Sequence, residues 1–268
     1  MDFDFSDDQE QLRDAVRKWV DKGYTFDRRR EITHAGGFDR AAYTELAELG
    51  LCGLYISEDH GGMGMGPVEG MVVMEELGRG IVMEPIQQAL ISGAVLEGYA
   101  PDAIKAEWLP KIAGGEAIVV LAHQERKSRY NISKCDAQAQ QQDGQWNITG
   151  TKSVVAAGDH ADAFLVPAMA AGKLALFLVA KGAKGSATSG YVTQDGARAA
   201  ELTLNQSPAS LVSLDGQTAL SHAVDIGIAS VCAEAVGVMD KTMAITVDYM
   251  NTRKQFNTTI ASFQALRH

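Results

Sequence analysis

Two clusters of polar side chains have the composition of an anion-binding site. The first follows a β-like run and places Arg126, Lys127 and Arg129 within four positions. Arginine is a forked, permanently charged donor, so this segment is either an exposed loop or an anion site. The second cluster, Arg253-Lys254-Gln255-Phe256, ends a long helical pattern. Its cations either meet the negative end of the helix dipole or clamp a phosphate across an interface.

Other motifs with catalytic spacing are absent or have a simpler structural explanation. The glycine cluster from His60 to Gly66 lacks the Gly-Lys-Ser/Thr of a phosphate loop, so we interpret it as a turn. The six histidines are scattered, which gives no candidate metal site. The sequence around Ser186 does not have the GxSxG pattern of a nucleophile elbow, so we predict that Ser186 is a loop residue. We predict that Arg28-Arg29-Arg30 forms a charged turn that is exposed to solvent.

Length and composition narrow the class of protein. The chain has 268 residues, of which 46% are hydrophobic and 22% charged, as in an ordinary globular protein. Its net charge of −10 disfavours nucleic acid and anionic lipid as partners. Three separated cysteines without CxxC favour a reducing compartment, and the acidic N-terminus lacks a signal-peptide core. No apolar run reaches the roughly 18 residues of a membrane span, so we expect a cytoplasmic protein.

Residues 1–114 predict an N-terminal helical domain. Ser6 and Gln9 have capping-box spacing, and a second helix from Arg40 closes at Gly50. Apolar residues recur at i+4 in the first helix at Leu12, Val16 and Val20. Further helices are predicted to begin near Pro67, Pro85 and Pro101.

Residues 115–214 predict a middle β domain, because short apolar runs alternate with turn residues. Asp143-Gly144 is a hairpin signal, and Asp195-Gly196 is a second candidate. No βαβ alternation occurs, which disfavours a Rossmann fold and favours an antiparallel barrel or sandwich. Strands are expected near residues 117–121, 145–149, 163–166, 174–179 and 201–204.

Residues 215–268 predict the first helices of a C-terminal helical domain. A proline-free pattern from Gln217 to Thr252 predicts a helix about 54 Å long, which needs a bundle or an oligomer to cover it. After a break near Asn257, the helical pattern resumes over residues 260–268. The fold class is therefore α+β and multi-domain, with an N-terminal α-helical domain, an antiparallel β-barrel or sandwich, and the start of a helix bundle.

This order of regions resembles the acyl-CoA dehydrogenases, which are FAD flavoenzymes. The resemblance covers essentially the whole chain. It is carried by Leu51-Cys52-Gly53-Leu54, Gly61-Gly62-Met63-Gly64, Glu75 to Arg79, Leu109-Pro110-Lys111, Trp146 to Lys152, and Arg253 to Phe256 with Phe263-Gln264. In the family, the last motif contacts the flavin dinucleotide of a neighbouring subunit.

The resemblance implies cofactor and substrate contacts residue by residue. FAD contacts are expected from Leu121, Gln124, Tyr130, Val154, Val155, Ala156, Arg253, Gln255, Phe256 and Gln264. Contacts with the acyl-CoA are expected from Arg129, Tyr130 and Asp225. The chain departs from the family in two places. In the segment from Gln124 to Asn131, only Glu125 matches the usual family sequence. Val154-Val155-Ala156 replaces the usual Trp-Ile-Thr/Ser, which removes a hydroxyl beside the flavin.

The implied activity is FAD-dependent α,β-desaturation of an acyl-CoA thioester in fatty acid and lipid metabolism. The usual catalytic carboxylate of the family lies beyond the position of His268, and the position used by a minority of members falls near Gly227. Asp225 lies close to that position. Three interpretations of Asp225 stay open: a substitute base, a contact with the ligand, or an acidic residue in the first turns of the helix. We therefore assign no catalytic residue and no metal ligand.

Ser128-Arg129-Tyr130-Asn131 resembles the small subunit of pimeloyl-CoA dehydrogenase-type enzymes, which act on dicarboxylyl-CoA or pair with a different subunit. The cations of this segment fit an acidic acyl tail or the phosphates of CoA. Implied partners are electron-transfer flavoprotein as acceptor and further subunits, as a homodimer, a homotetramer or an α2β2 assembly. Two alternatives stay open: a non-catalytic subunit of a heteromeric enzyme, and a binding or scaffold protein that has lost the flavin.

Overall fold

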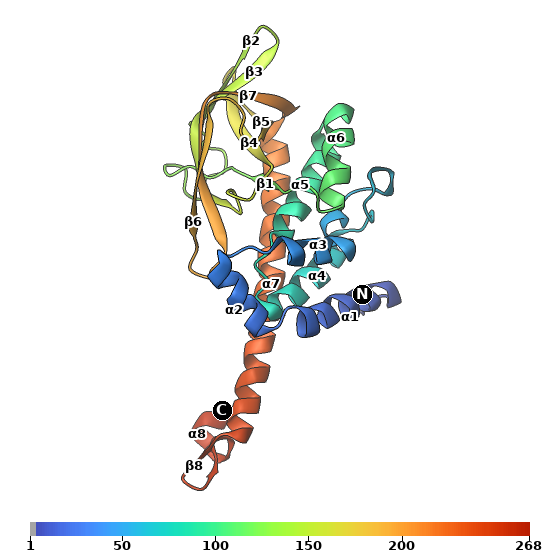
Figure 1. Cartoon of the computed structure of the whole chain (residues 1–268), viewed down its shortest axis with the longest axis vertical. Coiled ribbons are helices and arrows are strands. Elements are labelled where there is room, and N and C mark those ends of the chain that lie inside the picture. The colour runs from blue at the N-terminus through green and yellow to red at the C-terminus, as the bar shows by residue number, and fades with distance from the viewer. Residues whose placement is uncertain (1–3) are drawn as a thin grey trace.

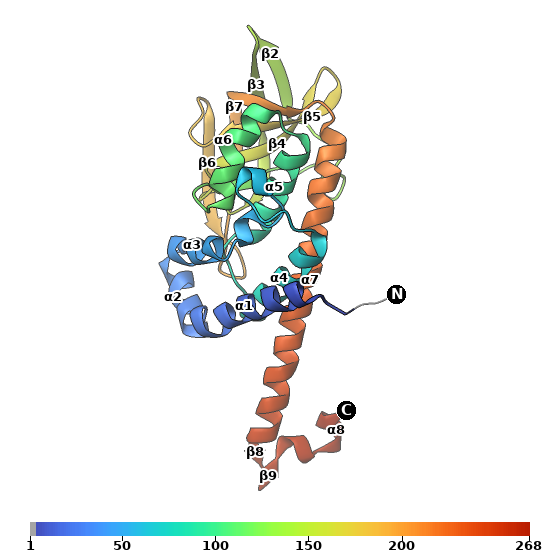
Figure 2. The ribbon, with the colours of Figure 1, turned by 90° about the vertical axis from the view of Figure 1, so that its right-hand side faces the viewer.

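The computed structural model describes residues 4–268 and has a body and a projecting arm (Figure 1). The body places N-terminal helices on one side and a β-sheet on the other side of the long helix α7 (Gly216–Thr252). The second half of α7 leaves the body and carries the C-terminal segment, as the perpendicular view also shows (Figure 2). A single buried cluster runs from the helices into the sheet, so the two halves of the body share one core.

The N-terminal half is helical, as its sequence predicts. The capping box at the start of α1 is confirmed, because Ser6 Oγ accepts a hydrogen bond from Gln9 N and Gln9 Oε1 accepts one from Ser6 N. Val16 and Val20 are buried, so the apolar face of α1 points into the core. The helices are α1 (Asp7–Gly23), α2 (Phe26–Ala35), α3 (Arg40–Glu48), α4 (Pro67–Gly80), α5 (Ile86–Tyr99) and α6 (Asp102–Ala113), with 3₁₀ turns at Leu51–Gly53 and Glu58–His60.

Helix α2 contains the run Arg28-Arg29-Arg30, and the prediction of a solvated turn there is wrong. Thr25 caps the helix by accepting a hydrogen bond from Arg28 N. The Arg28 guanidinium is only about a quarter exposed and lies 2.9 Å from Glu45 and 3.2 Å from Asp39. Arg29 donates to the carbonyl oxygen of Ile81 and to that of Asp195. Two of the three cations therefore tie elements together.

The glycine cluster is a turn, and it does not present its amides to a ligand. Gly62 N donates to Ser57 O, Met63 N to Gly53 O and Gly64 N to Ile56 O. Because these amides are used inside the loop, they cannot cradle a phosphate.

The middle region forms a sheet of seven strands that closes into a barrel. Strand β5 pairs with both β7 and β4, which completes a ring in the order β4-β2-β3-β7-β5, while β1 and β6 are attached at its edges. The pairings β1–β4 and β2–β4 are parallel and the other five are antiparallel. The strands are β1 (Val119–Leu121), β2 (Gln138–Gln142), β3 (Gln145–Ala156), β4 (Ala163–Ala170), β5 (Lys173–Ala180), β6 (Ser186–Val192) and β7 (Arg198–Ser213).

The turn at Asp143-Gly144 is confirmed as a two-residue hairpin between β2 and β3, with φ values of 50° and 80°. Asp195-Gly196 lies in a longer connection between β6 and β7. Ser186 begins β6, so the prediction that it is a loop residue is wrong.

Helix α7 is buried over its first part only. All of its buried residues lie between Gly216 and Gly237, where it packs against α4, α5 and β5. Contrary to the sequence analysis, α7 is long and apolar enough, by length and composition alone, to cross a membrane. Its packing within the body accounts for the apolar residues of the first part.

Close approach between α4 and α7 depends on two glycines. A Cβ on Gly78 would lie 2.2 Å from Glu234 O, and a Cβ on Gly237 would lie 1.8 Å from Glu75 O. The two backbones therefore touch directly at this crossing.

The C-terminal segment differs from the predicted helix. A small hairpin joins β8 (Lys254–Gln255) to β9 (Thr258–Thr259), with Phe256 and Asn257 at positive φ in its turn. A 3₁₀ turn at Ile260–Ser262 follows, and only α8 (Gln264–Arg267) is α-helical. The expected helix over residues 260–268 is therefore wrong in most of its length.

Candidate functional site

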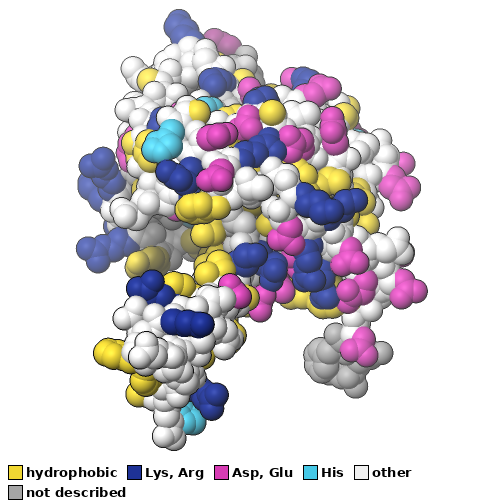
Figure 3. Space-filling model, turned by 60° about the horizontal axis from the view of Figure 1, so that its bottom comes forward, with side chains coloured by type: hydrophobic (Ala, Val, Ile, Leu, Met, Phe, Trp, Pro, Cys, Tyr) yellow, Lys and Arg dark blue, Asp and Glu magenta, His cyan; other side chains and the backbone are white. Residues whose placement is uncertain are grey.

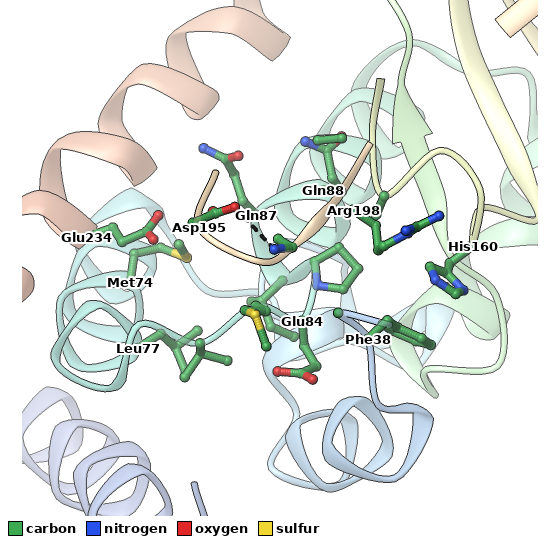
Figure 4. Close-up of a pocket in the computed structure, with 18 residues that line it drawn as sticks. Phe38, Met74, Leu77, Glu84, Gln87, Gln88, His160, Asp195, Arg198 and Glu234 are labelled. Atoms are coloured by element: carbon green, nitrogen blue, oxygen red, sulfur yellow. Dashed lines mark hydrogen bonds between the residues drawn. The ribbon is translucent and has the colours of Figure 1, made fainter. Parts of the chain in front are cut away.

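A cavity of about 150 Å³ lies where α4, α5, the barrel and α7 meet (Figure 4). Ala156, at the end of β3, is part of its wall. Ala156 is one of the residues that the sequence predicts beside the flavin. The apolar part of the lining comes from Met74, Leu77, Val82, Met83, Pro85 and Ile86.

Two glutamines of α5 hold the walls of this cavity in place. Gln87 Nε2 donates to Gly227 O at 3.0 Å, which ties α5 to α7. Gln88 Oε1 accepts a hydrogen bond from Leu121 N at 2.9 Å, which ties α5 to β1. The position that a minority of the family uses for its base, Gly227, thus lies beside the cavity without a carboxylate of its own.

Three acidic residues, Glu84, Asp195 and Glu234, belong to the lining of the cavity. Glu84 precedes α5 and is 4% exposed, and burial raises its pKa against smaller opposing effects of the Tyr24 hydroxyl and backbone amides. Glu84 Oε1 accepts a hydrogen bond from Asp39 N at 3.3 Å, and the Tyr24 hydroxyl also lies beside the Glu84 carboxyl. Glu234 of α7 is half-buried, and burial followed by the charge of Asp195 raises its pKa.

The barrel side of the cavity carries a neutralised cation. Arg198 Nε donates to Asp159 Oδ2 at 2.7 Å, and Arg198 Nη2 lies 2.5 Å from the same oxygen. Gly190 leaves room for this pair, because a Cβ there would lie 2.4 Å from Asp159 Oδ2. His160 stacks on Phe38 with ring centroids 4.5 Å apart, and burial lowers its pKa. Its imidazole is therefore neutral at neutral pH.

A second surface joins the two β-domain segments that are expected to hold the flavin. Ser153 N donates to Gln124 O at 2.8 Å, so the segment 121–131 runs beside the end of β3. Below this contact, Lys152 Nζ lies 2.7 Å from Glu125 Oε1 with both side chains buried. A shallow hollow of about 220 Å³ lies beside the pair.

The residues predicted on this surface differ in what they can offer a ligand. Gln124, Arg129 and Tyr130 are exposed, and Tyr130 is 99% exposed. Leu121 and Val155 are buried in the core, so only their backbone groups could meet a ligand. Their assignment as cofactor contacts, like that of the exposed residues, stays a prediction.

The donor set of this surface fits a flavin dinucleotide chemically. The Gln124 amide and the Tyr130 hydroxyl suit ring oxygens, and Arg126 and Lys127 suit a phosphate. The same segment includes His123, whose pKa burial and Lys152 lower to about 4, so its imidazole is neutral. Within residues 4–268 these groups lie on an open surface.

The other predicted cofactor contacts lie far from this surface. Arg253, Gln255, Phe256 and Gln264 are exposed at the end of the arm. Between Gly227 beside the cavity and Arg253, α7 rises by about 39 Å. One chain therefore does not bring the two sets of residues together. Asp225 is exposed on α7 and is not part of the lining of the cavity or of the shallow hollow beside Glu125.

A separate groove of about 450 Å³ lies where the arm leaves the body. It runs between the end of α4, the junction of α1 and α2, and the middle of α7, with Phe26, Ile81 and Ile245 among its exposed apolar residues. Figure 3 looks at the molecule from the arm and shows hydrophobic side chains between the arm and the body.

Sequence reasoning missed Glu84 and Glu234 as site residues. Glu84 was considered there only as the residue before Pro85, which opens a helix. One signal for Glu84 was available. In Ile81-Val82-Met83-Glu84-Pro85 a single acidic residue lies among apolar residues, and this pattern predicts a buried carboxyl group. No comparable signal marks Glu234, because the wall opposite it is built from distant parts of the chain.

Two parts of the chain match known family descriptions. Residues 6–116 match "Acyl-CoA dehydrogenase, N-terminal domain", and residues 215–268 match "Acyl-CoA dehydrogenase, C-terminal domain".

Whole-chain comparisons agree with these matches. Acyl-CoA dehydrogenase FadE12 of Mycobacterium tuberculosis is 30% identical over 288 residues, which cover 98% of this chain and 71% of FadE12. Acyl-CoA dehydrogenase FadE27 of the same organism is 28% identical over 271 residues, which cover 99% of this chain and 71% of FadE27. The crystal structure of the ChsE4-ChsE5 complex from Mycobacterium tuberculosis superimposes with a TM-score of 0.87 at 28% identity, covering 99% of this chain and 72% of that chain.

Proposed function

The chain belongs to the acyl-CoA dehydrogenase family, and on that premise we propose that it binds FAD and an acyl-CoA thioester for α,β-desaturation of the acyl group. The cavity beside Ala156 carries the proposal. Its volume equals about five water molecules, which suits a short acyl tail. Its apolar walls suit methylene groups, and Ala156 is one of the residues expected beside the flavin.

The residues of this chain would bind and orient the substrate. The chemistry that FAD supplies when bound is acceptance of a hydride from the β-carbon. Met74, Leu77 and Ile86 would exclude water from the acyl tail, while Gln87 and Gln88 hold the surrounding elements in register. Removal of the α-proton needs a carboxylate, and Gly227 offers none. We assign no catalytic base among residues 4–268.

Three measurements on the purified protein test this proposal. We expect flavin absorbance that stays with the protein on gel filtration. We also expect saturable binding of short acyl-CoA thioesters, and reduction of an artificial electron acceptor that depends on acyl-CoA. A protein that binds neither FAD nor acyl-CoA would contradict the proposal and favour a scaffold that kept the fold without the flavin.

A second candidate function is a non-catalytic subunit of a heteromeric acyl-CoA dehydrogenase. It is favoured by the absence of a carboxylate at Gly227 and by the similarity to a chain of the ChsE4-ChsE5 complex, which is named for two different proteins. Flavin and acyl-CoA binding without turnover, with turnover restored by co-expression with a second family member, would support this function over the first.

The assembly that we propose places the arm of one chain against the flavin of another. Past Gly237, α7 exposes Met239, Met243 and Ile245, and an apolar helix face of this kind is typical of subunit interfaces. A homodimer, homotetramer or α2β2 assembly would each bring Arg253 to a neighbour. We further propose a cytoplasmic location, a role in fatty acid and lipid metabolism, and electron-transfer flavoprotein as the acceptor.

A further inference from the structure

Most polar side chains in the lining of the cavity beside Ala156 are bound within the protein. The amides of Gln87 and Gln88 hold α5 against α7 and β1. The guanidinium of Arg198 is bound to Asp159. A tail that carries a hydroxyl or a charge would therefore find no free partner in these three side chains, and its burial there would cost free energy.

The acidic residues of the lining offer little to a polar tail. The Glu84 carboxyl lies against the Tyr24 hydroxyl and points away from the space (Figure 4). The Asp195 carboxylate is exposed and accepts a hydrogen bond from Ala197 N. Only Glu234 is left, half-buried, with a pKa that burial and then the charge of Asp195 raise. A neutral hydrocarbon tail therefore suits the cavity better than an anionic one.

The apolar part of the lining is suited to an aromatic ring. Met74 and Met83 bring two thioether sulfurs to the cavity, and Phe38 brings a ring that stacks on His160. Figure 4 shows Met74 and Phe38 on opposite sides of the lining. Thioether sulfur attracts the edge of an aromatic ring, and aromatic rings attract one another edge to face. Because the edge of a ring is positive, it also tolerates the Glu234 carboxyl.

The size of the cavity favours the same group. An apolar cavity of about 150 Å³ has room for one benzene ring. A straight chain that fills the same volume loses rotation about several bonds when it is confined, whereas a phenyl ring is rigid before it binds. A ring therefore fills the space at a lower entropic cost.

We infer that this cavity selects an acyl-CoA whose acyl group ends in one aromatic ring, with Met74 and Phe38 as side chains that contact the ring. This inference rests on the proposed function, because it assumes that the cavity holds the end of the acyl group. It names the substrate class as arylalkanoyl-CoA thioesters.

Three CoA thioesters with acyl groups of equal carbon number test the inference: 3-phenylpropanoyl-CoA, 3-cyclohexylpropanoyl-CoA and nonanoyl-CoA. All three have methylene groups at the α- and β-carbons and differ only beyond them. Titration calorimetry on the protein as purified with its flavin measures each affinity. We expect 3-phenylpropanoyl-CoA to bind roughly tenfold more tightly than nonanoyl-CoA and several-fold more tightly than 3-cyclohexylpropanoyl-CoA, the scale of contacts of a ring with sulfur and with a second ring.

A reference thioester that binds as tightly as 3-phenylpropanoyl-CoA, or more tightly, would overturn the inference. Butanoyl-CoA separates this result from a failure of the proposed function. If butanoyl-CoA binds and the three larger thioesters do not, the inference fails alone. If butanoyl-CoA also does not bind, the proposed function fails with it.

Met74→Leu tests the sulfur contact at nearly constant volume. Met74 is chosen because Met83 Sδ already accepts a hydrogen bond from Thr33 Oγ1 at 3.7 Å. The variant should lower the ratio of 3-phenylpropanoyl-CoA to 3-cyclohexylpropanoyl-CoA affinity by roughly twofold or more. Met71→Leu, at an exposed position of the same helix, is the matched control and should keep the ratio. An unchanged ratio in Met74→Leu would contradict the assignment of Met74.

Leu77→Phe tests the location of the ring. Leu77 is 3% exposed and lines the cavity, so a phenylalanine there would occupy the space that the inference gives to the substrate. The affinity for 3-phenylpropanoyl-CoA should fall on the order of tenfold, while that for butanoyl-CoA should change little. Circular dichroism checks the fold, and the comparison with Met74→Leu decides if Leu77→Phe does not fold. Equal losses for the two thioesters, or no loss for either, would place the ring elsewhere and overturn the inference.

Discussion

Lys152 Nζ lies 2.7 Å from Glu125 Oε1 in the interior of the β domain, where the Lys152 side chain is fully buried. The Glu125 carboxylate also accepts hydrogen bonds from Asp136 N and Ala137 N. Because Glu125 lies in the segment 121–131 and Lys152 lies on β3, the pair fixes one predicted flavin-contacting segment against the other. The ion pair thus shapes the surface that the two segments form.

Replacing Lys152 with methionine should destabilise the fold strongly. The change leaves the Glu125 carboxylate buried without its cation, and breaking a buried pair in this way costs about 3–5 kcal/mol. Urea unfolding followed by circular dichroism measures the loss in the free energy of unfolding. Lys134→Met, at an exposed lysine, is the control and should change it by less than about 0.5 kcal/mol. A loss below about 1 kcal/mol for Lys152→Met would show that the pair is not needed.

Acidification should remove a part of the stability that Glu125 supplies. Burial alone would raise the pKa of Glu125, but Lys152 and the two backbone amides hold it below 4.5. A carboxyl with a lowered pKa stabilises the fold above its unfolded-state pKa, and this contribution is lost as the pH falls through the folded-state value. The melting temperature should therefore fall below about pH 4.5. Glu125→Gln should show a shallower fall over the same range, and parallel curves would contradict the assignment.

The crossing of α4 and α7 should not tolerate a side chain at Gly237. A Cβ there would overlap the Glu75 carbonyl oxygen, so Gly237→Ala must push the helices apart. Overpacking of this kind typically costs about 1–3 kcal/mol. Gly98→Ala is a matched control, because a Cβ on Gly98 of α5 meets nothing within 4 Å. Thermal unfolding should separate the two variants, with Gly98→Ala at or above the parent protein. Equal melting temperatures would mean that the helices can separate freely.

The proposed role of Arg253 predicts a loss of FAD affinity without a loss of stability. Arg253 is exposed at the end of α7, so Arg253→Ala should leave the free energy of unfolding almost unchanged. A charge-assisted contact with a phosphate contributes roughly 1.5–3 kcal/mol, which corresponds to at least a tenfold loss of affinity. Fluorescence titration of FAD measures it, with Lys184→Ala at another exposed site as the control. Unchanged affinity in a verified oligomer would remove Arg253 from the cofactor site.

The exposed second half of α7 predicts self-association or pairing with a second subunit. Light scattering at micromolar concentration should give a mass above the 28.7 kDa of one chain. Met243 is 68% exposed on the arm, and Met243→Glu should lower that mass by placing a charge in the interface. Ala103→Glu on the exposed face of α6 should not. A monomer mass for the parent protein, alone and with a co-expressed family member, would contradict the proposed assembly.

The elements that the sequence predicts well are those with a strong local signal. Helix α7 has no proline and begins and ends within a residue or two of its predicted bounds, and the turn at Asp143-Gly144 needs only its own two residues. The hairpin signals at Asp143-Gly144 and Asp195-Gly196 imply the partner strands β2 and β6, but no bounds were predicted for these strands because they are polar, largely exposed and without apolar alternation. Their pairing with β3 and β7 is what makes them strands.

Only the part of the candidate site that lies next to a sequence motif could be predicted. Ala156 follows a recognisable hairpin segment, and the structure places it at the cavity. Glu84 and Glu234 are 150 positions apart, and no local pattern indicates that they face one space. The hydrogen bond from Gln87 to Gly227 and the helical crossing at Gly78 bring their elements together, and both are tertiary features.

The length of α7 also sets a fixed spacing in any assembly that uses both of its ends. The first half of this helix lies beside the cavity at Gly227, and its C-terminal end presents Arg253. An unbroken helix couples distance to rotation, since each added residue moves the far end by about 1.5 Å and turns it by about 100°. A single-residue insertion in the arm would therefore misdirect Arg253 around the helix axis more than it would displace it. An insertion of seven residues would nearly restore the direction while leaving the end about 10 Å too far away.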